Sequence, residues 1–255
     1  MILTIDIGNS RIKWASWLTE KIIARGVAEY SAETAADVID NLFSTVEKPQ
    51  RVFLVSVAGE QLYPALRDWV LRSWALDVEC LKTQKKFANI INAYDDPSRH
   101  GADRWAGIVA ACSHFPDSSV CVISAGTAIT FDLVEKSGQH LGGYILPSYI
   151  SMHEALLSNT ANIESTPDLQ YHEQGVPDNT DDAVNQGLHR LIQAGIREFC
   201  QLAHEKLGEP VQIVLTGGFA KNILAYPDMP SMHYKPDLVM QGLYDIMKQR
   251  SPGQS

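Results

Sequence analysis

The chain has 255 residues, enough for one large domain or two lobes of ordinary size, and its 45% hydrophobic content is normal for a globular protein. Its formal net charge of −9 argues against nucleic acid as a partner, because a duplex needs a basic face. It has no apolar run of membrane-spanning length and begins directly with a strand-like segment, so we expect a cytoplasmic protein with no membrane partner.

The first part of the chain reads as three short strands followed by helices that alternate with a strand. Apolar runs and period-two alternation predict strands at residues 2–5, 11–18 and 21–25 and a buried strand at 52–57. Helical periodicity predicts helices at 32–43, 61–74 and 102–114, with a polar loop at 94–101 before the third.

The second part repeats this order. Strands are expected at residues 120–123, 129–134 and 140–146, helices at 149–157 and 181–206, a strand at 211–215 and a helix from 219. Residues 251–255 form a polar tail with no structural signal.

An internal repeat relates the two parts. A shift of 118 positions places Ile5-Asp6-Ile7-Gly8-Asn9-Ser10 over Ile123-Ser124-Ala125-Gly126-Thr127-Ala128. Each copy is a turn between the first two strands of a meander. The repeat therefore predicts an α/β fold of two duplicated lobes, residues 1–117 and 118–255, with the turns facing each other across a central cleft. By analogy, this is the pattern of the actin and sugar-kinase (ASKHA) superfamily.

The first turn carries groups that suit a nucleotide phosphate. Gly8 lets the backbone approach a phosphate closely, Asn9 and Ser10 offer donors, and successive N–H groups can form an anion-binding nest. Asp6 is placed to hold Mg²⁺, and Lys13 to neutralise phosphate. Alone, the segment reads as an ordinary Asx-type turn; the second copy favours phosphate binding.

Two further turns and one helix start complete the candidate site. Gly126 and Thr127 are the phosphate contacts expected in the second turn, and Thr216-Gly217-Gly218 fits either adenosine or a plain strand-to-helix connection. Asp103 and Arg104 fall in the first turn of an apolar helix. Asp103 is either a favourable charge at a helix N-terminus or a general base, beside an arginine that can grip a carboxylate.

The sequence resembles the type III pantothenate kinases over nearly its whole length. The resemblance rests on these motifs in this order: Asp6-Ile7-Gly8-Asn9-Ser10-Arg11-Ile12-Lys13, Tyr94 seven residues before Gly101-Ala102-Asp103-Arg104, Gly126-Thr127-Ala128, Gly142-Gly143-Tyr144-Ile145 before Pro147, and Thr216-Gly217-Gly218. The combination is specific, whereas no single motif is.

The resemblance implies ATP-dependent phosphorylation of pantothenate to 4′-phosphopantothenate, the first step toward coenzyme A, with Mg²⁺ accompanying ATP. It implies that ATP is bound by Asp6, Ile7, Gly8, Asn9, Ser10, Arg11, Ile12, Lys13 and Thr127. It implies that pantothenate is bound by Tyr94, Gly101, Ala102, Asp103, Arg104 and Thr180, with Asp103 as the catalytic base. It also implies a homodimer whose pantothenate pocket is completed across the subunit interface.

One residue departs from the family pattern. Ser124 stands where the family usually has an aspartate that helps to bind an activating K⁺ or NH₄⁺ ion, so the sequence places that requirement in doubt. Two other functions stay open at this stage: a kinase of the same fold acting on a sugar or polyol, and a regulatory protein without catalysis. Retention of Asp6, Lys13 and Asp103 favours an enzyme over the regulator.

Overall fold

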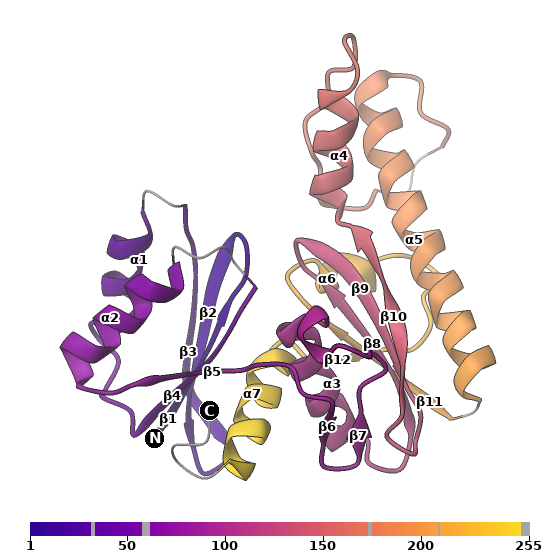
Figure 1. The fold of residues 1–255 in the computed structure, drawn as a ribbon. Coiled ribbons are helices and arrows are strands. Elements are labelled where there is room, and N and C mark those ends of the chain that lie inside the picture. The colour runs from indigo at the N-terminus through magenta and orange to yellow at the C-terminus, as the bar shows by residue number, and fades with distance from the viewer. Residues whose placement is uncertain (32–33, 58–61, 173–174, 209, 251–255) are drawn as a thin grey trace. The chain divides into compact units, whose positions relative to one another are not determined.

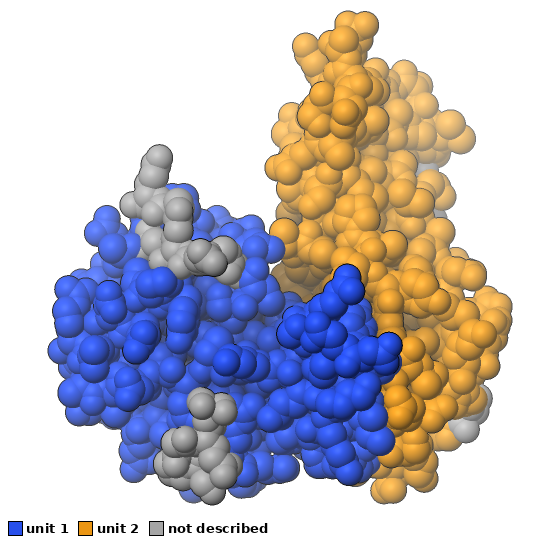
Figure 2. Space-filling model, viewed as in Figure 1, with its two compact units in different colours: residues 1–113, 237–255 blue, residues 114–236 orange. Residues whose placement is uncertain are grey.

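A computed structural model describes the chain except residues 32–33, 58–61, 173–174, 209 and 251–255. The expected polar tail lies outside the described residues, as do residues 32, 33 and 61 of two expected helices. The chain divides into two compact units (Figures 1 and 2), Met1–Ser113 with Asp237–Ser255 and His114–Pro236. No described helix is long and apolar enough to cross a lipid bilayer.

The first unit is built on a five-stranded sheet of order β3-β2-β1-β4-β5. Its strands are β1 Ile2–Ile7, β2 Arg11–Leu18, β3 Lys21–Glu29, β4 Arg51–Ser56 and β5 Val78–Cys80. Its helices are α1 Ala35–Phe43, α2 Leu62–Trp74, α3 Ala102–His114 and α7 Leu238–Gln249. A small hairpin (β6 Lys86–Phe87, β7 Ile90–Ile91) and the 3₁₀ turn η1 (Pro97–Arg99) precede α3.

Side chains of β1 alternate between an apolar face and a face that carries polar groups. Leu3, Ile5 and Ile7 are fully buried in a core with residues of α1 and α2. Thr4 points to the opposite face, where its hydroxyl accepts a hydrogen bond from Trp17 Nε1 at 2.8 Å and lies 3.6 Å from the sulfur of Met240 in α7. Asp6, two residues on, shares that second face. The apolar alternation of β1 therefore fixes the direction of the Asp6 carboxylate.

The second unit repeats this sheet with the order β10-β9-β8-β11-β12. Its strands are β8 Ser119–Ala125, β9 Ala128–Val134, β10 His140–Pro147, β11 Val211–Thr216 and β12 His233–Tyr234. Its helices are α4 Tyr149–Ser158, α5 Thr180–Leu207 and α6 Ala220–Leu224. Cys121, Ile123 and Ala125 of β8 are buried in a core that includes residues of α5, as Leu3, Ile5 and Ile7 are buried in the first unit.

The predicted duplication is confirmed, with a correction to the two turns. In both units the first strand pairs antiparallel with the second and parallel with the fourth. The first strands run on through Asp6-Ile7 and Ser124-Ala125, which the sequence assigned to turns. The turns are residues 8–10 in the first unit and only 126–127 in the second. Turn-forming composition was misleading because each strand has a neighbour on both sides that satisfies its backbone groups.

Helix α7 was not predicted from the sequence. It packs on β1 and β4, so residues 237–255 group with the first unit although they follow the second in the chain. The predicted lobe division at residues 117 and 118 stays a prediction. Gly242 explains part of this packing: a Cβ there would lie 1.8 Å from the carbonyl oxygen of Ala106 in α3. Only glycine permits so close an approach of two helices.

Candidate active site

Asp6 is a mostly buried acidic residue near the end of β1, just before the first turn. Its register partner on β2 is Lys13, and Lys13 Nζ lies 3.9 Å from Asp6 Oδ2. The side chain of Asp6 is 12% exposed, against 38% for Lys13. Burial raises the pKa of Asp6 to about 6; the charge of Lys13 lowers it, and that of Asp103 raises it further.

The turn at residues 8–10 is held by its own backbone and by one tyrosine. Gly8 N–H donates to the carbonyl oxygen of Arg11 at 2.9 Å, and the Tyr30 hydroxyl donates to the carbonyl oxygen of Gly8 at 2.5 Å. Asn9 and Ser10 are exposed. Gly8 does not use the positive φ that its sequence context allows. Tyr30 was missed by the sequence analysis, because nothing in its neighbourhood marks the turn it supports.

The remaining residues predicted to bind ATP in this segment differ in what they can offer. Ile7 and Ile12 are fully buried in the core, so neither side chain is available to a ligand. The exposed guanidinium of Arg11 donates to Glu29 Oε1 at 2.7 Å, across the β2–β3 pair. Lys13 is the cation of this segment nearest to Asp6.

The segment before α3 brings Tyr94 and Arg104 together. Arg104 is 8% exposed, and its Nη1 donates to the Tyr94 hydroxyl at 3.4 Å. Gly101 directly precedes α3, which begins at Ala102, and the N–H of Trp105 donates to the carbonyl oxygen of Gly101 at 3.0 Å. A Cβ on Gly101 would lie 2.8 Å from Asp103 Oδ1, so glycine there leaves room for the carboxylate. The predicted pantothenate residues of the first unit thus form one cluster.

The second turn presents neutral groups. Gly126 N–H donates to the carbonyl oxygen of Ala128 at 2.9 Å, and the exposed Thr127 accepts at its carbonyl oxygen from Ser151 Oγ at 3.3 Å. Ser124 is in register with Thr130 on β9 and with Thr216 on β11. In-register neighbours point to the same face of a sheet, so these three hydroxyl groups form a row that we term the hydroxyl row.

Gly217 has a structural role that the sequence left open. Its φ is +101°, and a Cβ would lie 2.2 Å from the carbonyl oxygen of Ala125. The Phe219 N–H also donates to this oxygen, at 3.0 Å. The turn at 216–218 therefore packs directly on the end of β8, beside the second turn. This packing accounts for the glycine without a ligand.

Thr180 is an exposed residue of the second unit, at the start of α5. Asn179 caps that helix by accepting a hydrogen bond from the Asp182 N–H at 3.0 Å. Thr180 lines a groove of about 660 Å³ between α4 and α5, with Leu156, Leu188 and Leu191 among its apolar lining. Its role with substrate stays a prediction.

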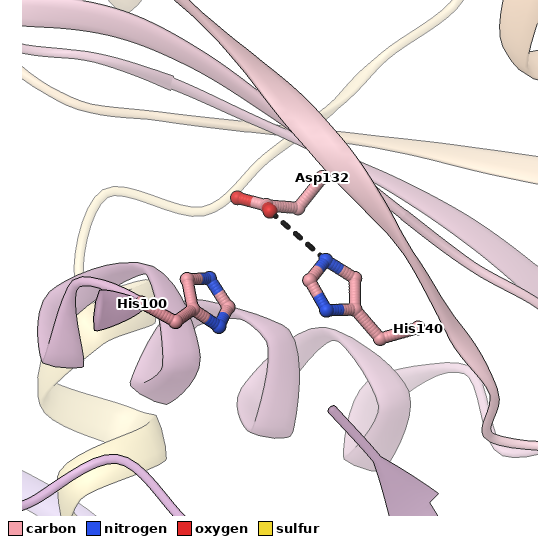
Figure 3. Close-up of side chains that lie close together, drawn as sticks. All are labelled: His100, Asp132 and His140. Atoms are coloured by element: carbon pink, nitrogen blue, oxygen red, sulfur yellow. Dashed lines mark hydrogen bonds and ion pairs between the residues drawn. The ribbon is translucent and has the colours of Figure 1, made fainter. Parts of the chain in front are cut away.

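A buried histidine–aspartate contact in the second unit was also missed by the sequence analysis. His140 Nε2 lies 3.1 Å from Asp132 Oδ1 (Figure 3), and the two side chains are 0% and 1% exposed. The pair ties β9 to β10 in the hairpin that follows the second turn. Removing one partner of such a pair leaves an uncompensated buried group, so the pair fixes the two strands against each other.

Comparisons with known proteins agree with this architecture. A family model described as type III pantothenate kinase matches residues 2–201. A type III pantothenate kinase of Nitrosococcus oceani is 33% identical over 98% of this chain and 95% of its own length. One of Pseudomonas aeruginosa is 35% identical over 95% of this chain and 97% of its own length.

A solved structure supports the fold alone. A putative 2-dehydro-3-deoxygalactonokinase from Sinorhizobium meliloti superposes with a TM-score of 0.59 at 13% identity, over 100% of this chain and 98% of that one. The expected fold class, an α/β fold of two duplicated lobes, is confirmed, and its architecture is like that of this sugar kinase.

Proposed function

The chain belongs to the type III pantothenate kinases, and we propose that it transfers the γ-phosphoryl group of ATP to the primary hydroxyl of pantothenate. The product is 4′-phosphopantothenate, in the first step of coenzyme A biosynthesis. One observation carries the assignment of the site: the compact unit that pairs the mostly buried Asp6 carboxylate with Lys13 Nζ at 3.9 Å also holds Arg104 against the Tyr94 hydroxyl. The groups proposed for the phosphate side and for the substrate side therefore belong to one compact unit.

Asp103 is the base in this proposal. It lies in the first turn of α3, a rigid element, with space beside it that Gly101 leaves open. It would accept the proton of the pantothenate hydroxyl as oxygen attacks the γ-phosphorus and the bond to the β-phosphate oxygen breaks, leaving ADP. Arg104, held by Tyr94, would bind the pantothenate carboxylate through its planar guanidinium.

The residues present fit a divalent cation. Asp6 is a mostly buried carboxylate whose pKa is raised to about 6, with one lysine at 3.9 Å as its partner. Such an anion gains from a hard cation that accepts oxygen ligands, and Mg²⁺ bound with ATP would neutralise phosphate charge. Lys13, the turn at 8–10 and Thr127 would hold the phosphates through donors and charge.

The arrangement of lobes and subunits also belongs to the proposal. We place ATP in a cleft between the lobes 1–117 and 118–255. We assign Thr180 to the pantothenate pocket completed by a second copy of the chain in a homodimer. The exposed position of Thr180 at the start of α5 supports this assignment, because the residue is available for contact.

The residues around Ser124 fit a monovalent cation less well than Asp6 fits Mg²⁺. The hydroxyl row of Ser124, Thr130 and Thr216 offers neutral oxygens and contains no carboxylate. Charge is what offsets the desolvation of a bound ion. We therefore propose that dependence on K⁺ or NH₄⁺ is weak or absent in this enzyme.

The test is release of ADP from ATP and Mg²⁺, measured with and without pantothenate. We expect ADP to appear at the rate of 4′-phosphopantothenate formation, identified by mass spectrometry, and only when pantothenate is added. ADP release that is indifferent to pantothenate, or that requires a sugar or polyol in its place, contradicts the proposal.

A further inference from the structure

Two buried polar residues lie next to the proposed pantothenate cluster and take no part in the proposed phosphoryl transfer. Asn92 follows β7 and is 0% exposed, and His100 precedes Gly101 and is 1% exposed. Buried polar side chains are costly unless their hydrogen bonds are made. Their contacts lead, step by step, to Arg104.

The orientation of the Asn92 amide follows from its neighbours. The backbone N–H of Tyr94 donates to Asn92 Oδ1 at 3.0 Å, and a backbone N–H can only donate. The other end of the amide is therefore the NH₂ group. It donates to the carbonyl oxygen of Gln84 at 3.4 Å and lies 3.1 Å from His100 Nδ1.

This orientation fixes the His100 ring. Because an amide NH₂ faces Nδ1, that nitrogen accepts, and the proton of the neutral ring is on Nε2. The main chain at His100 is held as well, since Thr83 Oγ1 donates to its carbonyl oxygen at 2.7 Å. Both the ring and the backbone at this position are therefore fixed directly before the start of α3.

The His100 ring in turn supports Tyr94. The two rings stack with centroids 4.7 Å apart and planes 18° from parallel. The Tyr94 hydroxyl accepts the hydrogen bond from Arg104 Nη1. Asn92 thus supports Tyr94 in two ways. It accepts a hydrogen bond from the Tyr94 backbone N–H, and it orients the His100 ring that stacks on the Tyr94 ring. The Tyr94 hydroxyl then fixes one nitrogen of the guanidinium.

We propose that Asn92 and His100 are positioning residues that set the Arg104 guanidinium for the carboxylate of the substrate. The inference rests on the proposed function, because it assigns Arg104 to pantothenate. An arginine loses much side-chain freedom when it binds, and a guanidinium already held in place loses less. Loss of the support should weaken pantothenate binding while ATP binding stays unchanged.

Three substitutions at position 100 separate the ring from its hydrogen bond. His100→Ala removes both, His100→Asn keeps an acceptor near Nδ1 but removes the ring, and His100→Phe keeps a ring to stack on Tyr94. We expect the KM for pantothenate to rise about 10-fold in the first two variants, which lose the aromatic pair. The rise should be about 3-fold in the third, which loses only the hydrogen bond. The KM for ATP should change less than about 2-fold.

The matched control is His189→Ala in the second unit. His189 is also buried, with Nδ1 2.8 Å from the Tyr226 hydroxyl and its ring 4.8 Å from that of Tyr149. Its loss should lower the thermal unfolding midpoint without raising the KM for pantothenate relative to that for ATP. A selective rise in this control equal to that of His100→Ala would contradict the inference.

A double-mutant cycle with Arg104→Lys gives the decisive measurement. If His100 acts through Arg104, His100→Ala should add less than about 2-fold to the pantothenate KM of Arg104→Lys. A further 10-fold rise would overturn the inference. Where the alanine variant does not fold by circular dichroism, His100→Asn takes its place in the cycle. If the unaltered enzyme shows no pantothenate-dependent ADP release, the proposed function itself has failed; an additive cycle in an active enzyme refutes the positioning role alone.

Discussion

The two copies of the duplicated hairpin share a backbone and differ in their chemistry. In the first unit, Asp6 of β1 is in register with Lys13 of β2. In the second, the same place is taken by Ser124 of β8 and Thr130 of β9. A charged pair in one copy thus corresponds to two hydroxyl groups in the other, and the second turn is one residue shorter. Duplication preserved the sheet, and the charged groups of the proposed reaction are concentrated in the first unit.

Burial explains why this division is favourable. The face of β1 that carries Asp6 is mostly closed to solvent, and burial is the largest cause of the raised pKa of Asp6. A charge in such a place is destabilising and calls for a functional reason, whereas a hydroxyl makes neutral hydrogen bonds at little cost. The comparison therefore predicts large effects from charge changes in the first unit and small ones in the second.

The largest effect is expected from Asp103→Asn. Loss of a positioned base should lower kcat by roughly 10²–10⁴ while the fold and ATP binding stay intact. Steady-state kinetics and nucleotide titration check this. Asp68→Asn, an exposed acid on α2, is the control and should leave kcat unchanged. Near-normal turnover by the Asp103 variant would remove this residue from the mechanism.

Asp6→Asn should abolish most activity and yet stabilise the metal-free protein. The folded pKa of about 6 lies above the ordinary aspartate pKa of 3.8, so the native carboxylate is destabilising at pH values above both. The difference corresponds to about 3 kcal/mol. The gain in the free energy of unfolding should therefore be full above about pH 7 and should decline as pH falls from 6 toward 4. Denaturant unfolding in EDTA across this range measures it; a gain that does not vary with pH would show another cause.

Arg104→Lys should weaken pantothenate binding by about 10-fold to 100-fold, the worth of a hydrogen bond to a charged group. ATP binding should hardly change. Pantothenamides, which lack the carboxylate, provide the control: their KM should rise much less than that of pantothenate. Pantothenamides that bind the unaltered enzyme as tightly as pantothenate would disprove the carboxylate contact.

The same comparison shows what the sequence could and could not predict. The duplication and the helix that carries Asp103 in its first turn were visible, because apolar periodicity and a repeated motif are properties of neighbouring residues. The pairing of Asp6 with Lys13 could not be predicted, because it depends on the register between β1 and β2. Gly217 was read as room for a ligand or a simple connection, and the structure shows that it makes room for Ala125.

Two other features depended on contacts between distant or irregular segments. Helix α7 joins the first unit through packing on strands more than 180 residues earlier in the chain, which periodicity cannot reveal. The Asn92–His100 contact lies in a segment of short strands and turns, where no repeating pattern predicts which side chains meet. Motifs in the sequence identified the candidate site residues, whereas only the folded structure revealed the groups that support them.

The smallest effect is expected at Ser124, where the second copy lacks its acid. Activity measured against K⁺ concentration at constant ionic strength should show weak or no activation in the natural enzyme, because the hydroxyl row supplies no charge. Ser124→Asp places a carboxylate in register with Thr130 and Thr216 and should make activation stronger and saturable. Bound ATP can supply oxygens of its own, so partial activation of the natural enzyme fits the same account. Ser124→Asn is the matched control, since it adds similar bulk without charge and should leave the response to K⁺ unchanged. Tight, saturable activation of the natural enzyme that the aspartate does not alter would show that position 124 does not govern the ion, and that the two copies differ in charge for another reason.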